Sequence, residues 1–261
     1  MTKTQSTQSS SQSAAYGAWQ SDISSELLTK STVRLGEPKL DNGNSYWLEQ
    51  RPEEKGRGVI VCQPANKEIA PFDVTPKSMS VRSKVHEYGG GCYTVDNDTV
   101  YFVNGEDQRV YAMSADQTHE SFNKPIVLSP ENSEQVNYRY ADFFIDSKRQ
   151  QLIAVCELHR THSSNNNDNT SKHNEPENSI ISLRLDGSST IGFNVLVFGN
   201  DFYSNPSVSP DDEKLAWLTW DHPNMPWDNS ECWIADFNHF SMLHKHRKVA
   251  GGVSSQHPSG E

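Results

Sequence analysis

The stretch YTVDNDTVYFV, residues 93–103, shows the unit from which this chain is built. Two runs rich in β-branched and aromatic residues flank the turn Asp96-Asn97-Asp98. Asp and Asn favour tight turns because their side chains hydrogen-bond to nearby backbone groups and because they tolerate a positive φ. The stretch therefore predicts two antiparallel strands joined by a short hairpin turn.

The same turn and strand occur four times along the chain. The strands that follow an Asp-containing turn begin at residues 46, 100, 152 and 215, at separations of 54, 52 and 63 residues. Another strand precedes each turn, and two more follow, at 58–62 and 72–74, 109–113 and 126–128, 180–183 and 195–197, and 232–235 and 248–250. Four antiparallel strands repeated at this spacing are typical of a β-propeller blade. We therefore expect an all-β fold, a β-propeller of about four four-stranded blades. A two-sheet sandwich is the alternative, although a sandwich does not require this repeat.

Three segments fall outside the repeat. Residues 1–14 are rich in Ser, Gln and Thr, which predicts a disordered tail. The partial propeller domain then covers residues 15–261, with a short helix over 23–30. Residues 160–178 predict a disordered surface insertion, which explains the longest separation between repeats. Residues 253–261 resemble the entry to a fifth blade, so the propeller is expected to be incomplete.

The composition narrows the classes of partner. The net charge of −11 repels nucleic-acid phosphates and anionic lipid, so neither nucleic acid nor membrane is expected to bind. The charge favours solubility, and a funnel for cationic peptides is the weaker alternative. The four cysteines are scattered without a CxxC pair, which fits buried thiols in a reducing compartment. Because the sequence has neither an apolar membrane span nor a secretory signal, we expect a cytoplasmic location.

The run VRSKVHEYGGG, residues 81–91, is the most distinctive local motif. A glycine-rich phosphate loop needs a helix behind it, but a strand follows here, so the glycines predict a bulge or close backbone packing at a strand start. The adjacent His86 and Glu87 point to opposite faces of a strand and cannot share a metal ion. Arg82, His86, Glu87 and Tyr88 are the candidate channel or substrate contacts, because the start of an inner blade strand lines the propeller channel.

The second distinctive run is WDHPNMPWD, residues 220–228. Its two prolines restrict a loop between two strands, and rigid aromatic loops are good recognition elements. Asp221, Asn224 and Trp227 are therefore candidate contacts to a partner domain or ligand. The alternative is that both Trp rings pack against neighbouring blades.

We find no sequence pattern that is typical of a catalytic site. Neither G-x-S-x-G nor H-E-x-x-H occurs. His159, His162 and His173 lie in or beside the polar insertion, where a solvated loop is the better interpretation than a metal site. We predict no catalytic residue, no metal site and no cofactor in this chain.

Several runs taken together resemble a known family. They are YGAWQS at 16–21, YWLE at 46–49 with RPE at 51–53, VHEYGGG at 85–91 with YFVN at 101–104 and DQRVY at 107–111, NMPWD at 224–228 and AGG at 250–252. In these runs the chain, from about residue 16 to its end, resembles the N-terminal propeller of the acylaminoacyl-peptidase and dipeptidyl-aminopeptidase branch of the prolyl oligopeptidase family.

The resemblance implies a function for the propeller. Members of the family join it to a C-terminal α/β-hydrolase domain with a Ser–Asp–His triad, and the propeller restricts access so that short peptides are selected. The chain would then be the substrate-gating and docking part of a serine peptidase that cleaves short peptides or aminoacyl and acylaminoacyl substrates. Its partners would be short peptides and the hydrolase domain, which this sequence lacks.

Because no triad residue can be carried over, the chain alone is predicted to be inactive. It would be a truncated gene product, one part of a split gene, or a cloned domain. Two other interpretations stay open. One is a free-standing propeller that binds a protein or peptide, and the other is a non-functional remnant.

Overall fold

The computed structural model describes residues 13–18, 23–25, 32–161 and 175–252 of the chain. The chain divides into two units, residues 1–32 and 33–261. The described residues of the first unit are largely exposed, and Tyr16 is fully so. Residues 1–12 of the predicted tail, most of the predicted helix over 23–30, and the predicted fifth-blade entry at 253–261 lie outside the described residues.

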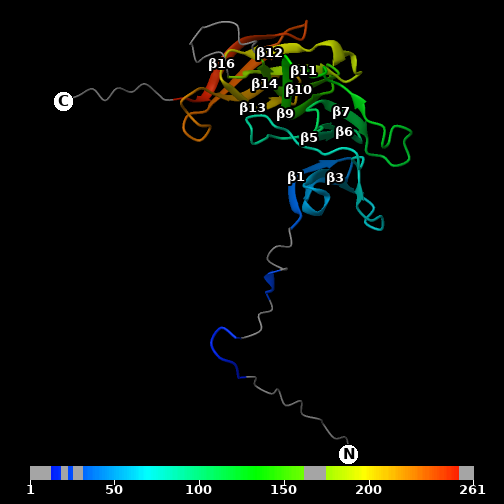
Figure 1. The fold of residues 1–261 in the computed structure, drawn as a ribbon. Coiled ribbons are helices and arrows are strands. Elements are labelled where there is room, and N and C mark those ends of the chain that lie inside the picture. The colour runs from blue at the N-terminus through cyan, green and yellow to red at the C-terminus, as the bar shows by residue number, and fades with distance from the viewer. Residues whose placement is uncertain (1–12, 19–22, 26–31, 162–174, 253–261) are drawn as a thin grey trace, which may run out of the picture. The chain divides into compact units, whose positions relative to one another are not determined.

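The described residues of the second unit form four antiparallel sheets, each made of four consecutive strands (Figure 1). We call these sheets blades 1 to 4. Blade 1 contains β1 (Arg34–Asp41), β2 (Asn44–Arg51), β3 (Arg57–Gln63) and β4 (Phe72–Asp73); blade 2 contains β5 (Tyr93–Asp96), β6 (Thr99–Val103), β7 (Val110–Ser114) and β8 (Ile126–Val127). Blade 3 contains β9 (Val136–Asp146), β10 (Gln151–Arg160), β11 (Glu177–Arg184) and β12 (Asn194–Phe198); blade 4 contains β13 (Phe202–Val208), β14 (Lys214–Trp220), β15 (Glu231–Phe237) and β16 (Leu243–Gly251). The predicted all-β propeller-type fold, with four four-stranded sheets among the described residues, is confirmed.

The Asp-containing turns have the backbone expected from their residues. In blade 2 the hairpin pairs Asp96 with Thr99, and the two residues between them have positive φ, 48° for Asn97 and 55° for Asp98. This is the two-residue turn whose twist matches antiparallel strands, and Asn and Asp tolerate it better than other side chains. Short-range chemistry therefore sets the position of each hairpin.

These turns also join neighbouring blades, which the sequence did not reveal. The Asp98 carboxylate in blade 2 accepts hydrogen bonds from the amides of Asn42 and Asn44 in blade 1, both at 3.0 Å. Between blades 3 and 4, the Arg149 guanidinium donates to the backbone oxygen of Asp212 at 2.6 Å. One end of the sheets is thus tied together by the residues that form its turns.

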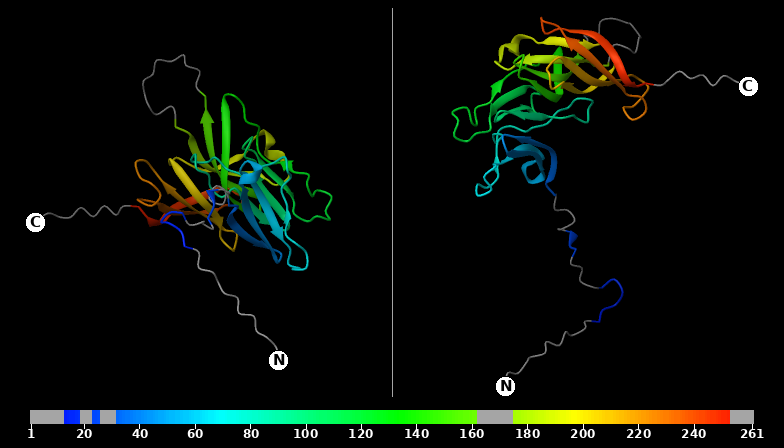
Figure 2. Two further views of the ribbon diagram at one scale, coloured as in Figure 1. Left: turned by 60° about the horizontal axis from the view of Figure 1, so that its bottom comes forward. Right: turned by 180° about the vertical axis from the view of Figure 1, so that it is seen from behind.

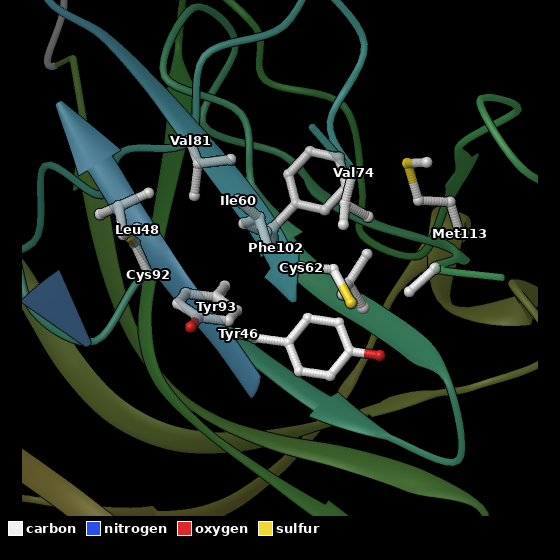
Figure 3. Packing of buried hydrophobic residues seen from close by; sticks show 12 residues of the cluster. Tyr46, Leu48, Ile60, Cys62, Val74, Val81, Cys92, Tyr93, Phe102 and Met113 are labelled. Atoms are coloured by element: carbon white, nitrogen blue, oxygen red, sulfur yellow. The ribbon is translucent and has the colours of Figure 1, made fainter. Parts of the chain in front are cut away.

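Three apolar clusters lie between successive blades, and the four sheets follow one another in chain order (Figure 2). In blade 2, Val100 and Phe102 pack toward blade 1, whereas Tyr101 and Val103 pack toward blade 3. Alternate residues of a strand point to opposite faces, so a blade covered on both sides needs a continuous apolar run. Figure 3 shows the first cluster, in which Phe102 lies among blade 1 residues that include Ile60.

The first strands of successive blades are linked by hydrogen bonds at irregular positions. Glu37, Asp142 and Asn205 each have positive φ within β1, β9 and β13. The Glu37 carboxylate accepts from the Cys92 backbone at 3.0 Å, and the Asp142 carboxylate accepts from Gly91 at 2.7 Å and Asn205 at 3.0 Å. These contacts connect all four blades through β1, β9, β13 and the two residues that precede β5.

The predicted boundaries of the insertion were too wide. Arg160 ends β10, where it pairs with Val136 of β9, and Glu177 and Asn178 begin β11, where they pair with Leu158 and Glu157 of β10. Residues 162–174 lie outside the described residues. The four cysteines are free, and three of them are buried, as expected from their apolar surroundings.

A membrane-crossing helix needs about 20 apolar residues. The described ranges contain no such helix.

Candidate functional site

The seven predicted contact residues lie in two connections between strands. Residues 82–88 belong to the connection between blades 1 and 2, shortly before β5, and residues 221–227 join β14 to β15. Trp220, at the end of β14, pairs with Phe202 at the start of β13. The ring of His86 lies 5.8 Å from that of Trp220, so the two predicted groups meet at one end of the blades. We call this end the loop face.

The motif that contains His86 is a tight turn and not the start of a strand. Strand β5 begins only at Tyr93, and residues 85–88 form a turn in which Gly89 donates to the Val85 oxygen at 2.8 Å. The strand argument used to separate His86 from Glu87 was therefore wrong. The two side chains still differ in direction, since that of His86 is 8% exposed and that of Glu87 is 79% exposed.

The His86 side chain lies against aromatic rings of blade 4. Its ring centroid is 5.3 Å from that of Phe202, and the Phe202 and Trp220 rings stack at 5.3 Å. The His222 ring packs edge-on against Phe202 at 4.8 Å. Aromatic pairs at these separations add stability beyond area burial. These ring contacts hold the 85–88 turn, which precedes blade 2, against blade 4.

The Tyr88 ring extends this aromatic group toward solvent. It lies 5.7 Å from the His86 ring and is 72% exposed. A tyrosine in this setting offers an apolar ring and a hydroxyl to a ligand at little cost in conformational entropy. Among the predicted substrate contacts, it is well placed to touch a bound molecule.

A buried carboxylate, Glu157 in β10, holds the turn from the side of blade 3. It accepts the His86 backbone N–H at 3.1 Å and pairs with His159 Nε2 at 2.9 Å. His86 Nδ1 lies 3.5 Å away without a hydrogen-bond partner among the described residues. Burial raises the pKa of Glu157, but hydrogen bonds with His86 and His159 outweigh it and lower that pKa below its ordinary value.

Sequence reasoning missed Glu157 and its neighbour Arg139. Arg139 Nη1 donates to the Lys84 oxygen at 3.0 Å and to the Glu87 carboxylate at 2.6 Å, and it lies 3.6 Å from Glu157. The available signal was the single acidic residue within the apolar run LIAVCEL at 152–158. A charged residue buried in such a run requires partners.

Arg82 is held by its backbone and makes no side-chain hydrogen bond or ion pair with this network among the described residues. Its backbone is fixed, since its N–H donates to the Val103 oxygen at 3.1 Å and its oxygen accepts from Gln108 at 3.1 Å. Its side chain is exposed and forms no ion pair with the described residues. A nearby hollow of about 320 Å³ is lined by charged side chains of both signs, including Lys84 and Arg139. The hollow adds charged surface next to the turn through Lys84 and Arg139.

The glycines after the turn allow two blades to approach closely. A Cβ atom on Gly90 would lie 2.8 Å from the Ala141 Cβ and 3.0 Å from an Asp142 carboxylate oxygen. The Asp142 N–H donates to the Gly91 oxygen at 2.7 Å, and the Gly91 N–H donates to the Asp142 carboxylate, also at 2.7 Å. The predicted role in close backbone packing before a strand is confirmed.

Of the two Trp residues in the run 220–228, one is buried and the other is exposed. Trp220 is 6% exposed, whereas Trp227 is 76% exposed. Asp221 organises the loop, since its carboxylate accepts from the Asp201 backbone at 2.7 Å and its backbone oxygen accepts from Asn224 at 3.0 Å. Packing between blades therefore applies to Trp220 alone, and Trp227 is free for contact with a partner.

The loop face carries side chains that can make aromatic and polar contacts. It offers an exposed phenol, an exposed carboxylate, an exposed guanidinium and an indole ring. Within the described ranges, no three His, Cys, Asp or Glu side chains are grouped so that they could hold a metal ion.

Comparison with solved structures finds peptidases. The chain is 29% identical to a Mycobacterium tuberculosis puromycin-hydrolyzing peptidase, with a TM-score of 0.75 over 90% of this chain and 35% of that chain. It is 26% identical to puromycin hydrolase, with a TM-score of 0.78 over 92% of this chain and 36% of that chain. A mutant of puromycin hydrolase complexed with PGG gives the same identity and coverage and a TM-score of 0.79. No family model and no curated protein matches the chain. The chain thus spans about a third of the length of the peptidases it resembles.

Proposed function

Because this chain is a propeller of the prolyl oligopeptidase type, as its motifs predicted, we propose that it is the substrate-gating and docking part of a serine peptidase. The substrates are short peptides or aminoacyl and acylaminoacyl compounds. The observation that carries the proposal is the similarity over 90% of this chain to a puromycin-hydrolyzing peptidase of which it spans 35%. Cleavage belongs to a hydrolase domain, and this chain supplies selection.

Substrate contact is assigned to the loop face. Tyr88 and Glu87 present exposed side chains from a fixed turn, and Arg82 adds an exposed guanidinium in the same connection between blades 1 and 2. His86 is largely buried, so it acts by packing beneath Tyr88. Such a surface suits a small substrate with an aromatic group and an amino group, since the ring can stack and the carboxylate can pair with the amine.

Docking of the hydrolase domain is assigned to the 221–228 loop. The exposed indole of Trp227 resembles the aromatic anchors that dominate protein interfaces. Asp221 and Asn224 support this contact by holding the loop, since the backbone and side-chain amides of Asn224 both donate to the Asp221 backbone oxygen. The free cysteines suit the reducing cytoplasm, where we place the protein.

The proposal is tested by binding and by complementation. Puromycin should bind the isolated chain saturably in calorimetry, and Tyr88→Ala should weaken binding about tenfold, as truncation of an interface tyrosine does. Phe240→Ala, which removes another aromatic ring that is 72% exposed and lies between β15 and β16, is the matched control. The chain alone should not hydrolyse puromycin or aminoacyl chromogenic substrates. Adding a separately produced hydrolase domain of puromycin hydrolase should give turnover that Trp227→Ala reduces.

Two results would overturn the proposal. Hydrolysis by the chain alone that survives replacement of its serines would place catalysis elsewhere. Equal puromycin binding by the Tyr88→Ala and Phe240→Ala variants would remove the loop face from substrate contact.

A free-standing binding module is the second candidate. It is favoured by the purely binding character of the side chains on the loop face. It predicts the same saturable binding but no gain of turnover with any hydrolase domain, so complementation separates the two functions.

A further inference from the structure

The turn that presents Tyr88 has an unfavourable backbone. His86 and Glu87 are consecutive residues with positive φ, 53° and 65°, followed by Gly89 at 94°. Only Gly adopts this region freely, because a Cβ atom there crowds the following carbonyl oxygen. Two such residues in succession persist only where their surroundings hold them, and this kind of strain gathers at functional positions.

Local hydrogen bonds do not account for the turn by themselves. The Glu87 N–H donates to the Lys84 oxygen at 3.1 Å, and Gly89 N–H donates to Val85. The N–H of His86, the first strained residue, has no such local acceptor and donates to Glu157, 71 residues further along the chain. The acceptor that fixes the start of the strained pair is therefore a side chain of another blade.

Glu157 is itself rigidly placed. It pairs with Arg139 in the register of β9 and β10 and with Asn178 in that of β10 and β11, so both neighbouring strands fix its backbone. Its side chain is only 3% exposed. A buried carboxylate is costly unless donors or cations surround it; here His86 and His159 hydrogen-bond to it, and the Arg139 guanidinium lies 3.6 Å away.

The same network reaches the exposed side chain of the turn. Arg139 lies 3.6 Å from Glu157 and donates to both the Lys84 oxygen and the Glu87 carboxylate. Glu157 thus orients the cation that holds Glu87. Charge-assisted hydrogen bonds of this kind are about twice as strong as neutral ones.

We infer that Glu157 is a positioning residue, which holds the 85–89 turn in its strained form so that Tyr88 and Glu87 are presented together for substrate contact. Glu157 touches no substrate. The substrate contact rests on the proposed function, whereas the holding of the turn rests on the geometry above. This residue therefore sets how well the loop face is preorganised.

The test measures the turn and the binding separately in the full chain. Amide hydrogen exchange of residues 84–89 and the Kd of puromycin are compared for wild type, Glu157→Ala and Glu157→Gln. Glu157→Ala removes the acceptor, whereas Glu157→Gln keeps its shape and one acceptor oxygen and lowers the risk of unfolding. Glu177→Gln, on the adjacent strand but 68% exposed, is the control. Thermal unfolding verifies that each variant is folded.

We expect the His86 amide to exchange about ten- to a hundredfold faster in Glu157→Ala, as for the loss of a hydrogen bond to a charged group. Glu157→Gln should restore part of this protection, and Glu177→Gln should match wild type. The variants that lose more amide protection should also bind puromycin more weakly.

Two failures are distinguishable. The positioning role would be overturned if residues 84–89 exchanged at the wild-type rate in both folded variants, Glu157→Ala and Glu157→Gln. If Glu157→Ala does not fold, wild-type exchange in Glu157→Gln decides the question. Faster exchange with unchanged puromycin binding would keep the positioning role and overturn the proposed substrate contact.

Discussion

Replacing Gly90 by Ala tests the close approach of blades 2 and 3 at the glycine run. The added Cβ would lie 2.8 Å from the Ala141 Cβ and 3.0 Å from an Asp142 carboxylate oxygen. Carbon atoms in ordinary contact are about 3.5–4.0 Å apart, so β9 would have to retreat by roughly 0.7 Å or more. The retreat would stretch the paired hydrogen bonds between Gly91 and Asp142.

The expected loss of stability follows from two opposing effects. Overpacking of a well-packed contact costs about 1–3 kcal/mol. Replacing Gly by Ala restricts the unfolded chain, which stabilises the fold by about 0.4–1 kcal/mol where the backbone permits it. We therefore expect Gly90→Ala to lower the free energy of unfolding by about 1–2 kcal/mol. Gly36→Ala is the matched control, since no atom lies within 4 Å of its added Cβ.

Urea unfolding followed by Trp fluorescence measures both variants. The midpoint of Gly90→Ala should fall while that of Gly36→Ala stays level or rises, and the slope m should be the same for both. The gap of about 2 kcal/mol corresponds to a factor of roughly 30 in the unfolding equilibrium. Equal midpoints for Gly90→Ala and wild type would show that blades 2 and 3 do not touch at this position.

Three further predictions concern stability. Arg149→Met should lower the free energy of unfolding by about 2–3 kcal/mol in urea titration, because it removes a guanidinium 3.7 Å above the Phe237 ring and a hydrogen bond between blades 3 and 4; a wild-type midpoint would contradict this. Trp220→Ala should cost about 3–5 kcal/mol and Trp227→Ala less than about 0.5, as judged by thermal unfolding, since only the first is buried. The pKa of Glu157 is lower in the folded chain than its ordinary value of 4.5, so the ionised carboxylate stabilises the fold at pH values above 4.5. This stabilisation is lost as the pH falls through the folded-state pKa. The Tm difference between wild type and Glu157→Gln should therefore shrink on acidification, and a constant difference would argue against an ionised Glu157.

The blades could be predicted because their signals are local. A strand buried on both faces requires a continuous apolar run, and a two-residue hairpin requires residues that accept positive φ. Both signals recur at fixed spacing, so each blade supports the interpretation of the others. The links between turns, such as Asp98 to Asn42, were not predictable because they join residues 56 positions apart.

The candidate site was only partly predictable for the same reason. The motif around His86 identified the right segment, but its conformation depends on Glu157 and on the rings of blade 4. A strained turn has no local preference that a sequence pattern can display, since tertiary contacts stabilise it. Glu157 was hidden because an acidic residue in a strand usually faces solvent, and only the packing of blade 3 shows that it does not.

The two candidate contacts on the loop face meet at Trp220. Its ring packs against His86 of the substrate-contact turn, and Asp221 of the docking loop follows it directly in the chain. A change at Trp220 would therefore disturb both contacts and the core together, and a loss of function in such a variant would not locate either one. Tyr88 and Trp227 avoid this difficulty because their side chains are 72% and 76% exposed and can be removed without a cavity. The separate roles of substrate contact and docking are thus best decided by these two residues, each assayed for binding and for complementation.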